Sequence, residues 1–147
     1  MSREGGFGMA VNSVAGVVRS VGAPQRWLRQ VLGLDAVVTG GNGLAYVAFA
    51  GPLGELLGVS EGVLREIGVF LLGYAALVAV LAGQRRPAPL GVKAVIDANL
   101  VWPVLSVVAM ELWLEPTTAG MVWIPVQAAT VAGFAVLQWR ALRATSA

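Results

Sequence analysis

Four long apolar runs, separated by short polar breaks, dominate the pattern of the chain. They cover residues 31–51, 63–83, 94–114 and 119–139. Each run has about 21 residues, which as a helix is about 31 Å long and matches the hydrocarbon core of a bilayer. Glycine, proline and polar residues fill the breaks between the runs. The pattern predicts an all-α integral membrane protein, a four-transmembrane-helix bundle.

Composition supports this prediction and narrows the chemistry. Hydrophobic residues make up 57% of the chain and charged residues 12%, whereas a soluble domain carries about 25% charged residues. The chain has no cysteine and no histidine, which excludes disulfides, thiolate catalysis and the usual haem and zinc ligands. We find no metal-ligand spacing and no phosphate-binding motif, so we expect no metal and no cofactor.

The distribution of basic residues predicts an orientation. Of the ten lysines and arginines, Arg65 lies on one side of the predicted spans and the others lie on the opposite side. The others are Arg3, Arg19, Arg26, Arg29, Arg85, Arg86, Lys93, Arg140 and Arg143. Because cytoplasmic loops are enriched in basic residues, we expect both termini to be cytoplasmic in the cell (plasma) membrane. The high sequence pI of about 9.7 then comes from basic residues at the edges of the membrane, and we expect no nucleic acid partner.

The expected organisation is a cytoplasmic tail over residues 1–27, one transmembrane domain over residues 28–143 and a short tail over residues 144–147. Apolar residues recur at helical spacing in the first tail, at Phe7, Val11, Val14, Val18 and Val21. This spacing is typical of a helix lying on the membrane interface. A tail without regular structure is the alternative.

The first span carries a polar stripe. Asp35, Thr39, Asn42 and Tyr46 follow at steps of 4, 3 and 4 residues, which places them on one face of a helix. A carboxylate in a bilayer core costs about 2.5–3.5 kcal/mol, so an intramembrane acid is a candidate functional residue. We therefore expect this face to point into the bundle.

The third and fourth spans carry further candidates. Asp97 and Glu111 are fourteen residues apart and share a face of the third span, while Asn99 and Trp102 lie on its other side. The fourth span has a stripe at steps of 4, 3 and 4 residues, made of Trp123, Gln127, Thr130 and Phe134. Three inward stripes predict a pocket with Asp35 and Asp97 at its cytoplasmic floor and with aromatic walls.

Each candidate also has a structural interpretation. Asp35 and Asp97 lie close to Arg29 and Lys93 in the sequence and could pair with them. Glu111 could face exterior water. Asn42, Gln127 and Thr130 could form hydrogen bonds between helices. The glycines at positions 40, 41 and 43 are typical of close helix packing.

Three segments carry a resemblance to a known group of proteins. Residues 34–46, 99–107 and 122–130 read LDAVVTGGNGLAY, NLVWPVLSV and VWIPVQAAT. They resemble small four-span integral membrane proteins of actinobacteria, mostly uncharacterised. Some small bacterial membrane proteins of this general look are terpene cyclases that act on prenylated aromatic substrates. The resemblance implies an isomerase or lyase of secondary metabolite biosynthesis.

The first hypothesis is therefore a membrane-embedded cyclase of a prenyl or epoxy-prenyl chain. A protonated carboxyl can donate to an alkene or epoxide, and aromatic faces stabilise the carbocation. Asp97 or Asp35 would be the general acid and Glu111 a second acid or final base. The hydrophobic substrate would contact Trp102, Trp123, Tyr46, Phe134, Asn42, Asn99 and Gln127.

Two other classes stay open from the sequence. The same stripes fit a proton-coupled transporter or channel that works as a homo-oligomer, because an intramembrane Asp can couple protons to a substrate. They also fit a non-catalytic assembly subunit whose stripes are buried against another protein in the lipid bilayer.

Overall fold

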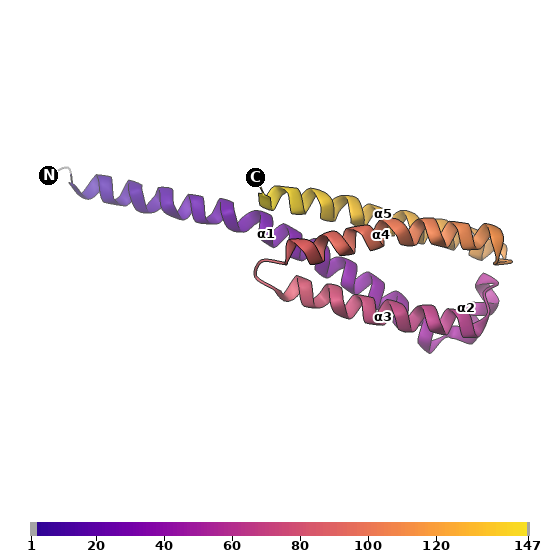
Figure 1. Cartoon of the computed structure of the whole chain (residues 1–147). Coiled ribbons are helices and arrows are strands. Elements are labelled where there is room, and N and C mark those ends of the chain that lie inside the picture. Colours follow the sequence, from indigo (N-terminus) through magenta and orange to yellow (C-terminus); the bar gives the residue numbers. More distant parts are fainter. Residues whose placement is uncertain (1–2, 147) are drawn as a thin grey trace.

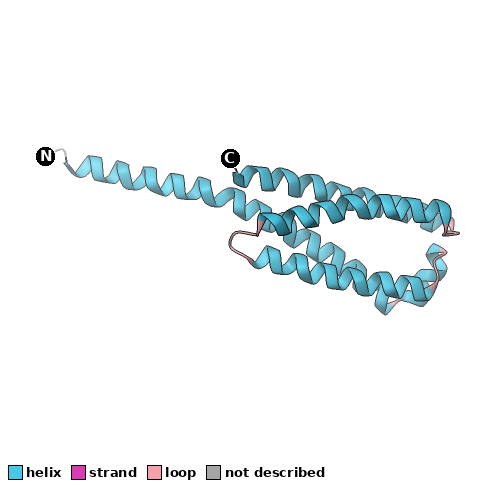
Figure 2. Ribbon diagram, viewed as in Figure 1, coloured by secondary structure: helices cyan, strands magenta, loops and turns pink. Residues whose placement is uncertain are grey.

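A computed structural model describes the backbone of residues 3–146 and the side chains of residues 22–146. Every regular element in this part of the chain is a helix (Figure 2). The helices are α1 (Arg3–Ala48), α2 (Ala50–Leu57), α3 (Glu61–Gly83), α4 (Pro89–Leu112) and α5 (Thr118–Ser146). The all-α prediction is confirmed.

Four of these helices are long and apolar enough to cross a membrane. The segments are Gly22–Ala48, Glu61–Gly83, Pro89–Leu112 and Thr118–Ser146. They correspond one to one with the four predicted apolar runs. The fold therefore indicates a multi-pass membrane protein.

The apolar run predicted to fill the first span, about 31–51, is divided between two helices. The helix α1 ends at Ala48, and α2 begins at Ala50 as a separate short helix. Pro52 lies in the first turn of α2, where its missing N–H needs no partner within the helix. An apolar run that reads as one span is thus a long helix followed by a short one.

The N-terminal part of α1 extends past the other helices (Figure 1). Its backbone is helical from Arg3 onward and joins the first span without a break. The side chains of the predicted interfacial face, Phe7 to Val21, lie outside the described residues. The location of this segment on the membrane interface stays a prediction.

The bundle consists of two helix pairs. The helix α1 packs along α3, and α4 packs along α5, while α1 also contacts α5 and joins the two pairs (Figure 1). The helices α3 and α4, by contrast, barely touch. Gly43 and Gly68 allow the close approach of α1 and α3, because a Cβ on Gly43 would lie 2.9 Å from the carbonyl oxygen of Gly68.

An apolar cluster lies toward each end of the bundle. The first consists of buried residues Leu28, Leu32, Val78, Val92, Val95, Ile96, Ala135, Ala141 and Leu142. It lies at the end that carries Arg26, Arg29, Arg85, Arg86, Lys93, Arg140 and Arg143, which we call the basic end. The second cluster lies at the opposite end and consists of Tyr46, Leu57, Val59, Leu64 and Leu71. Along α1, Asp35, Thr39 and Asn42 lie between Leu32 of the first cluster and Tyr46 of the second.

The turn after α2 ties the opposite end together. Gly58 ends α2 with a φ of 74°, a left-handed conformation that favours glycine. The backbone N–H of Thr117 donates to the carbonyl oxygen of Leu57 at 3.1 Å. This bond connects the α2–α3 turn to the α4–α5 turn and holds the two helix pairs together at this end.

Candidate functional site

Asp35 is the centre of a buried hydrogen-bond network. Its side chain has no exposed surface. One carboxyl oxygen, Oδ2, accepts from Asn99 Nδ2 at 2.8 Å and from Gln138 Nε2 at 2.6 Å. The other, Oδ1, accepts from the hydroxyl of Thr39 at 2.9 Å, one helical turn away. The carboxyl group is therefore held in place by three donors.

All four long helices contribute to this network. Asn99 Nδ2 also donates to Gln138 Oε1 at 3.0 Å. The hydroxyl of Tyr74 lies 2.9 Å from Asn99 Oδ1, to which it can donate, and 3.2 Å from the carbonyl oxygen of Val95. Asp35 is on α1, Tyr74 on α3, Asn99 on α4 and Gln138 on α5. A single polar cluster thus fixes the relative positions of the helices.

No basic side chain neutralises Asp35 within the described part of the chain. The ion pair found there within 4.0 Å joins Arg65 to Glu61, both exposed, at the opposite end. Arg29 instead donates from Nε to the carbonyl oxygen of Ala82 at 3.0 Å, so the interpretation in which Arg29 pairs with Asp35 is contradicted. Burial of a carboxyl without a cationic partner is costly, and the three hydrogen bonds oppose that cost.

A cavity of about 250 Å³ adjoins the network. Three residues both line the cavity and make hydrogen bonds of the network: Thr39, Tyr74 and Asn99. The remaining walls are mostly apolar and aromatic: Val38, Asn42, Phe70, Leu71, Ala98, Val101, Trp102, Leu105, Gln127, Thr130, Val131 and Phe134. Asp35 itself lies behind Thr39 and Asn99, just outside the cavity.

Two aromatic rings cover the seam where α3 and α4 barely touch. Phe70 and Trp102 stack with ring centroids 5.5 Å apart and planes 14° from parallel. Both rings line the cavity, and Phe70 is 56% exposed on the outer surface. At this seam the cavity is bordered by side chains and not by packed helix backbones, and it is only partly enclosed, because lining residues such as Val101 and Leu105 are exposed.

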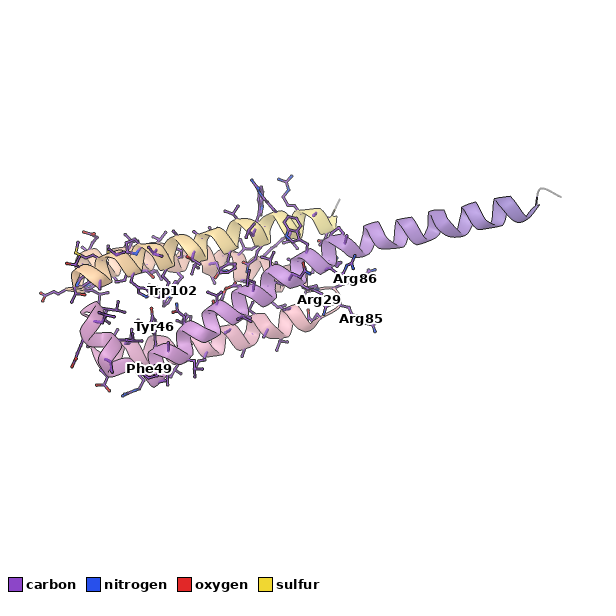
Figure 3. The ribbon with its side chains drawn as sticks, turned by 180° about the vertical axis from the view of Figure 1, so that it is seen from behind. Arg29, Tyr46, Phe49, Arg85, Arg86 and Trp102 are labelled. Carbon is purple, nitrogen blue, oxygen red and sulfur yellow. The ribbon has the colours of Figure 1, made fainter. Side chains whose placement is uncertain are left out.

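A second cavity of about 230 Å³ lies next to the first and shares Trp102, Leu105 and Gln127 with it. The hydroxyl of Tyr46 donates to Gln127 Oε1 at 2.9 Å and accepts from Trp123 Nε1 at 2.8 Å in its wall. In Figure 3, Tyr46 and Trp102 lie away from Arg29, Arg85 and Arg86 of the basic end. The cavities therefore follow one another along the bundle.

Most predicted site residues are brought together. The structure places Asn42, Asn99, Trp102, Gln127 and Phe134 around the first cavity and Tyr46 and Trp123 around the second. The stripe of α1 that begins at Asp35 faces the interior, as its spacing predicts.

The structure does not bring Asp97 or Glu111 to either cavity. Both side chains are exposed, and Asp97 lines a hollow on the outer surface near Lys93. The reason is helical geometry: Asp97 precedes Asn99 by two residues, which is about 200° around a helix. Once Asn99 points into the network, Asp97 must point outward. Asp35 is therefore the one acid among the three candidates that adjoins the cavity.

Three residues of the site, Phe70, Tyr74 and Gln138, were not predicted as site residues. Gln138 follows Phe134 by four residues, so extension of the stripe on the fourth span by one step would have included it. Tyr74 is the one residue with a polar side-chain group between residues 69 and 83, and that isolation was the available signal. Phe70 has no polar group and lies in an apolar span, so nothing in the sequence distinguishes it from its neighbours.

No protein-family model matches the chain, and no match is found among curated proteins or solved structures. The geometry of the fold and the site defines a helical, multi-pass membrane protein with a buried acid next to an apolar, aromatic cavity.

Proposed function

We propose that the protein is a membrane-embedded cyclase that closes a prenyl or epoxy-prenyl chain by acid-initiated carbocation chemistry. The observation that carries the proposal is the buried Asp35 carboxyl, which reaches an aromatic, apolar cavity through the hydroxyl of Thr39. A proton donor and a dry aromatic cavity are what this reaction needs. The absence of histidine and cysteine is compatible with it.

Thr39 can transfer the proton because a hydroxyl both accepts and donates. The acid form of Asp35 donates from Oδ1 to Thr39 Oγ1 across the 2.9 Å contact, while Thr39 donates its own proton to an alkene carbon or an epoxide oxygen. The resulting carbocation is attacked by a neighbouring double bond, which closes a ring. The cyclised cation then loses a proton to Thr39 Oγ1, which passes its own proton back to the Asp35 carboxylate, and the product is an isomer of the substrate. Asn99 and Gln138 hold the carboxylate while it is charged.

The cavity walls fit the intermediate. The faces of Phe70, Trp102 and Phe134 can stabilise a carbocation through cation–π attraction. Apolar walls also exclude water, which would otherwise capture the cation as an alcohol. Two small cavities in succession suit an elongated apolar chain better than a compact polar molecule.

The arrangement of the bundle favours a substrate that arrives from the lipid. Apolar clusters pack toward both ends of the bundle, and the rings of Phe70 and Trp102 stack at the α3–α4 seam. A hydrophobic substrate in the bilayer reaches this seam without crossing water. This arrangement favours an enzyme over the alternative of a transporter or channel.

We also infer that the basic end, and with it both termini, faces the cytoplasm of the plasma membrane. Support comes from the distribution of charge. Most basic residues lie at this end, whereas Arg65 lies at the opposite end with four acids, Glu55, Glu61, Glu66 and Glu115.

The test is turnover of linear prenylated aromatic substrates, with and without a terminal epoxide, by the protein in liposomes. We expect a product of unchanged mass and a new retention time. Asp35→Asn and Thr39→Val should both abolish it, because each interrupts proton delivery. Asp97→Asn and Glu111→Gln are the matched controls and should retain turnover. Loss of turnover in the controls, or its survival in Asp35→Asn, would contradict the proposal.

A further inference from the structure

A hollow of about 570 Å³ lies on the outer surface between α4 and α5, at the basic end. Its lining includes Lys93, Ile96, Asp97, Trp139, Leu142 and Arg143. Ile96 and Leu142 are buried and form an apolar base, while the three charged side chains are exposed. The hollow is separate from the two interior cavities and plays no part in the proposed cyclisation.

The charges around this hollow are not paired with one another. Among the side chains that the structure describes, neither Lys93 nor Arg143 comes within 4.0 Å of the Asp97 carboxylate. The guanidinium of Arg143 lies over the ring of Trp139 instead, 4.9 Å from its centroid. Two cationic groups and one carboxylate thus face the same hollow with free hydrogen-bonding capacity.

The residues beside the hollow are typical of the membrane–water boundary. Trp139 is 47% exposed and is followed directly by Arg140. A tryptophan next to basic residues at the end of a span is typical of the headgroup region. A ligand there would have an apolar part along Trp139 and a polar part that carries both signs of charge.

We propose that this hollow binds a phospholipid whose headgroup combines a phosphate with a primary ammonium, as in phosphatidylethanolamine. The phosphate would contact Lys93 and Arg143, and the ammonium would donate hydrogen bonds to Asp97. A trimethylammonium headgroup has no N–H to donate, and a purely anionic headgroup leaves Asp97 without a partner. Asp97 is therefore the residue that selects the headgroup.

The experiment is native mass spectrometry of the detergent-purified protein with an equimolar mixture of phosphatidylethanolamine and phosphatidylcholine that have identical acyl chains. We expect the wild type to bind phosphatidylethanolamine about two- to fivefold better, the effect of one exposed charge-assisted contact. Asp97→Asn should bring the ratio to about one. Glu111→Gln, another exposed acid on α4, is the matched control and should keep the wild-type ratio.

A second variant tests the phosphate contacts independently of Asp97. Combined Lys93→Gln and Arg143→Gln substitutions should lower the binding of both lipids to the same extent, because both headgroups carry the phosphate. Equal binding of the two lipids by the wild type, or an unchanged ratio in Asp97→Asn, would overturn the proposal. So would preferred binding of phosphatidylglycerol in a competition arm, since that result indicates a general basic surface.

Discussion

Truncation of Asn99 to alanine is the sharpest test of the polar network as a stabilising element. Asn99 takes part in three side-chain hydrogen bonds, with Asp35, Gln138 and Tyr74. Its side chain is 3% exposed, so these bonds are shielded from solvent in the native protein. Asn99→Ala removes all three and leaves Gln138 Oε1 without the donor that it has in the native protein.

The magnitude follows from the contacts. Hydrogen bonds between membrane helices contribute about 0.6 kcal/mol each on average, so three of them contribute about 2 kcal/mol. The amide oxygen left unsatisfied at Gln138 adds about 1 kcal/mol or more. We therefore expect Asn99→Ala to lower the free energy of unfolding by about 3 kcal/mol, which is more than a hundredfold in the unfolding equilibrium constant.

Reversible unfolding in mixed micelles measures this free energy, and Asn42→Ala is the matched control. Asn42 lines the same cavity and is half-buried, but it has no hydrogen bond through its side chain to another described residue. Asn42→Ala should lower the free energy of unfolding by about 0.5 kcal/mol or less. If the two variants differ by less than about 1 kcal/mol, the buried network does not hold the helices together and the reasoning is refuted.

Three further predictions concern packing and the network. Gly43→Ala should destabilise the fold by about 1–3 kcal/mol, because the added Cβ would lie 2.9 Å from the backbone of α3. Gly41 has open space around it, so Gly41→Ala should leave the free energy of unfolding unchanged in the same assay. Gly120→Ala should also destabilise the fold, because the added Cβ would lie 2.1 Å from the carbonyl oxygen of Leu57. An unchanged free energy of unfolding would contradict the packing described for this turn. Tyr74→Phe should cost about 0.6 kcal/mol and retain turnover, because the ring stays in the cavity wall; complete loss of turnover would place the hydroxyl in the proton path.

Most of the site residues that could be predicted from the sequence were found from the spacing of polar residues within a single helix. The stripe from Asp35 to Tyr46 faces the interior because all its members lie at helical steps, and such steps are read from the chain alone. The end of α1 was not predictable in this way. Hydropathy does not distinguish a continuous span from a helix that stops at Ala48 and restarts at Ala50, because both segments are apolar.

The relative rotation of the helices is the other part that the sequence does not contain. Asp97 and Asn99 are both polar and both lie in the third span, and only packing decides which one points inward. The same holds for the glycines of α1: Gly43 packs against α3, whereas Gly41 has open space. Partners such as Tyr74 and Gln138 emerge only when four helices are docked together.

Turnover in D₂O is the measurement that tests the central claim most directly. The substrate is a linear prenylated aromatic compound that ends in an alkene, incubated with the protein in liposomes. We predict a cyclic product in which one non-exchangeable deuterium replaces one hydrogen of the substrate, formed by the wild type and not by a folded Asp35→Asn variant. A labelled product from Asp35→Asn, or no product from a wild type that binds the substrate in its cavity, would contradict it.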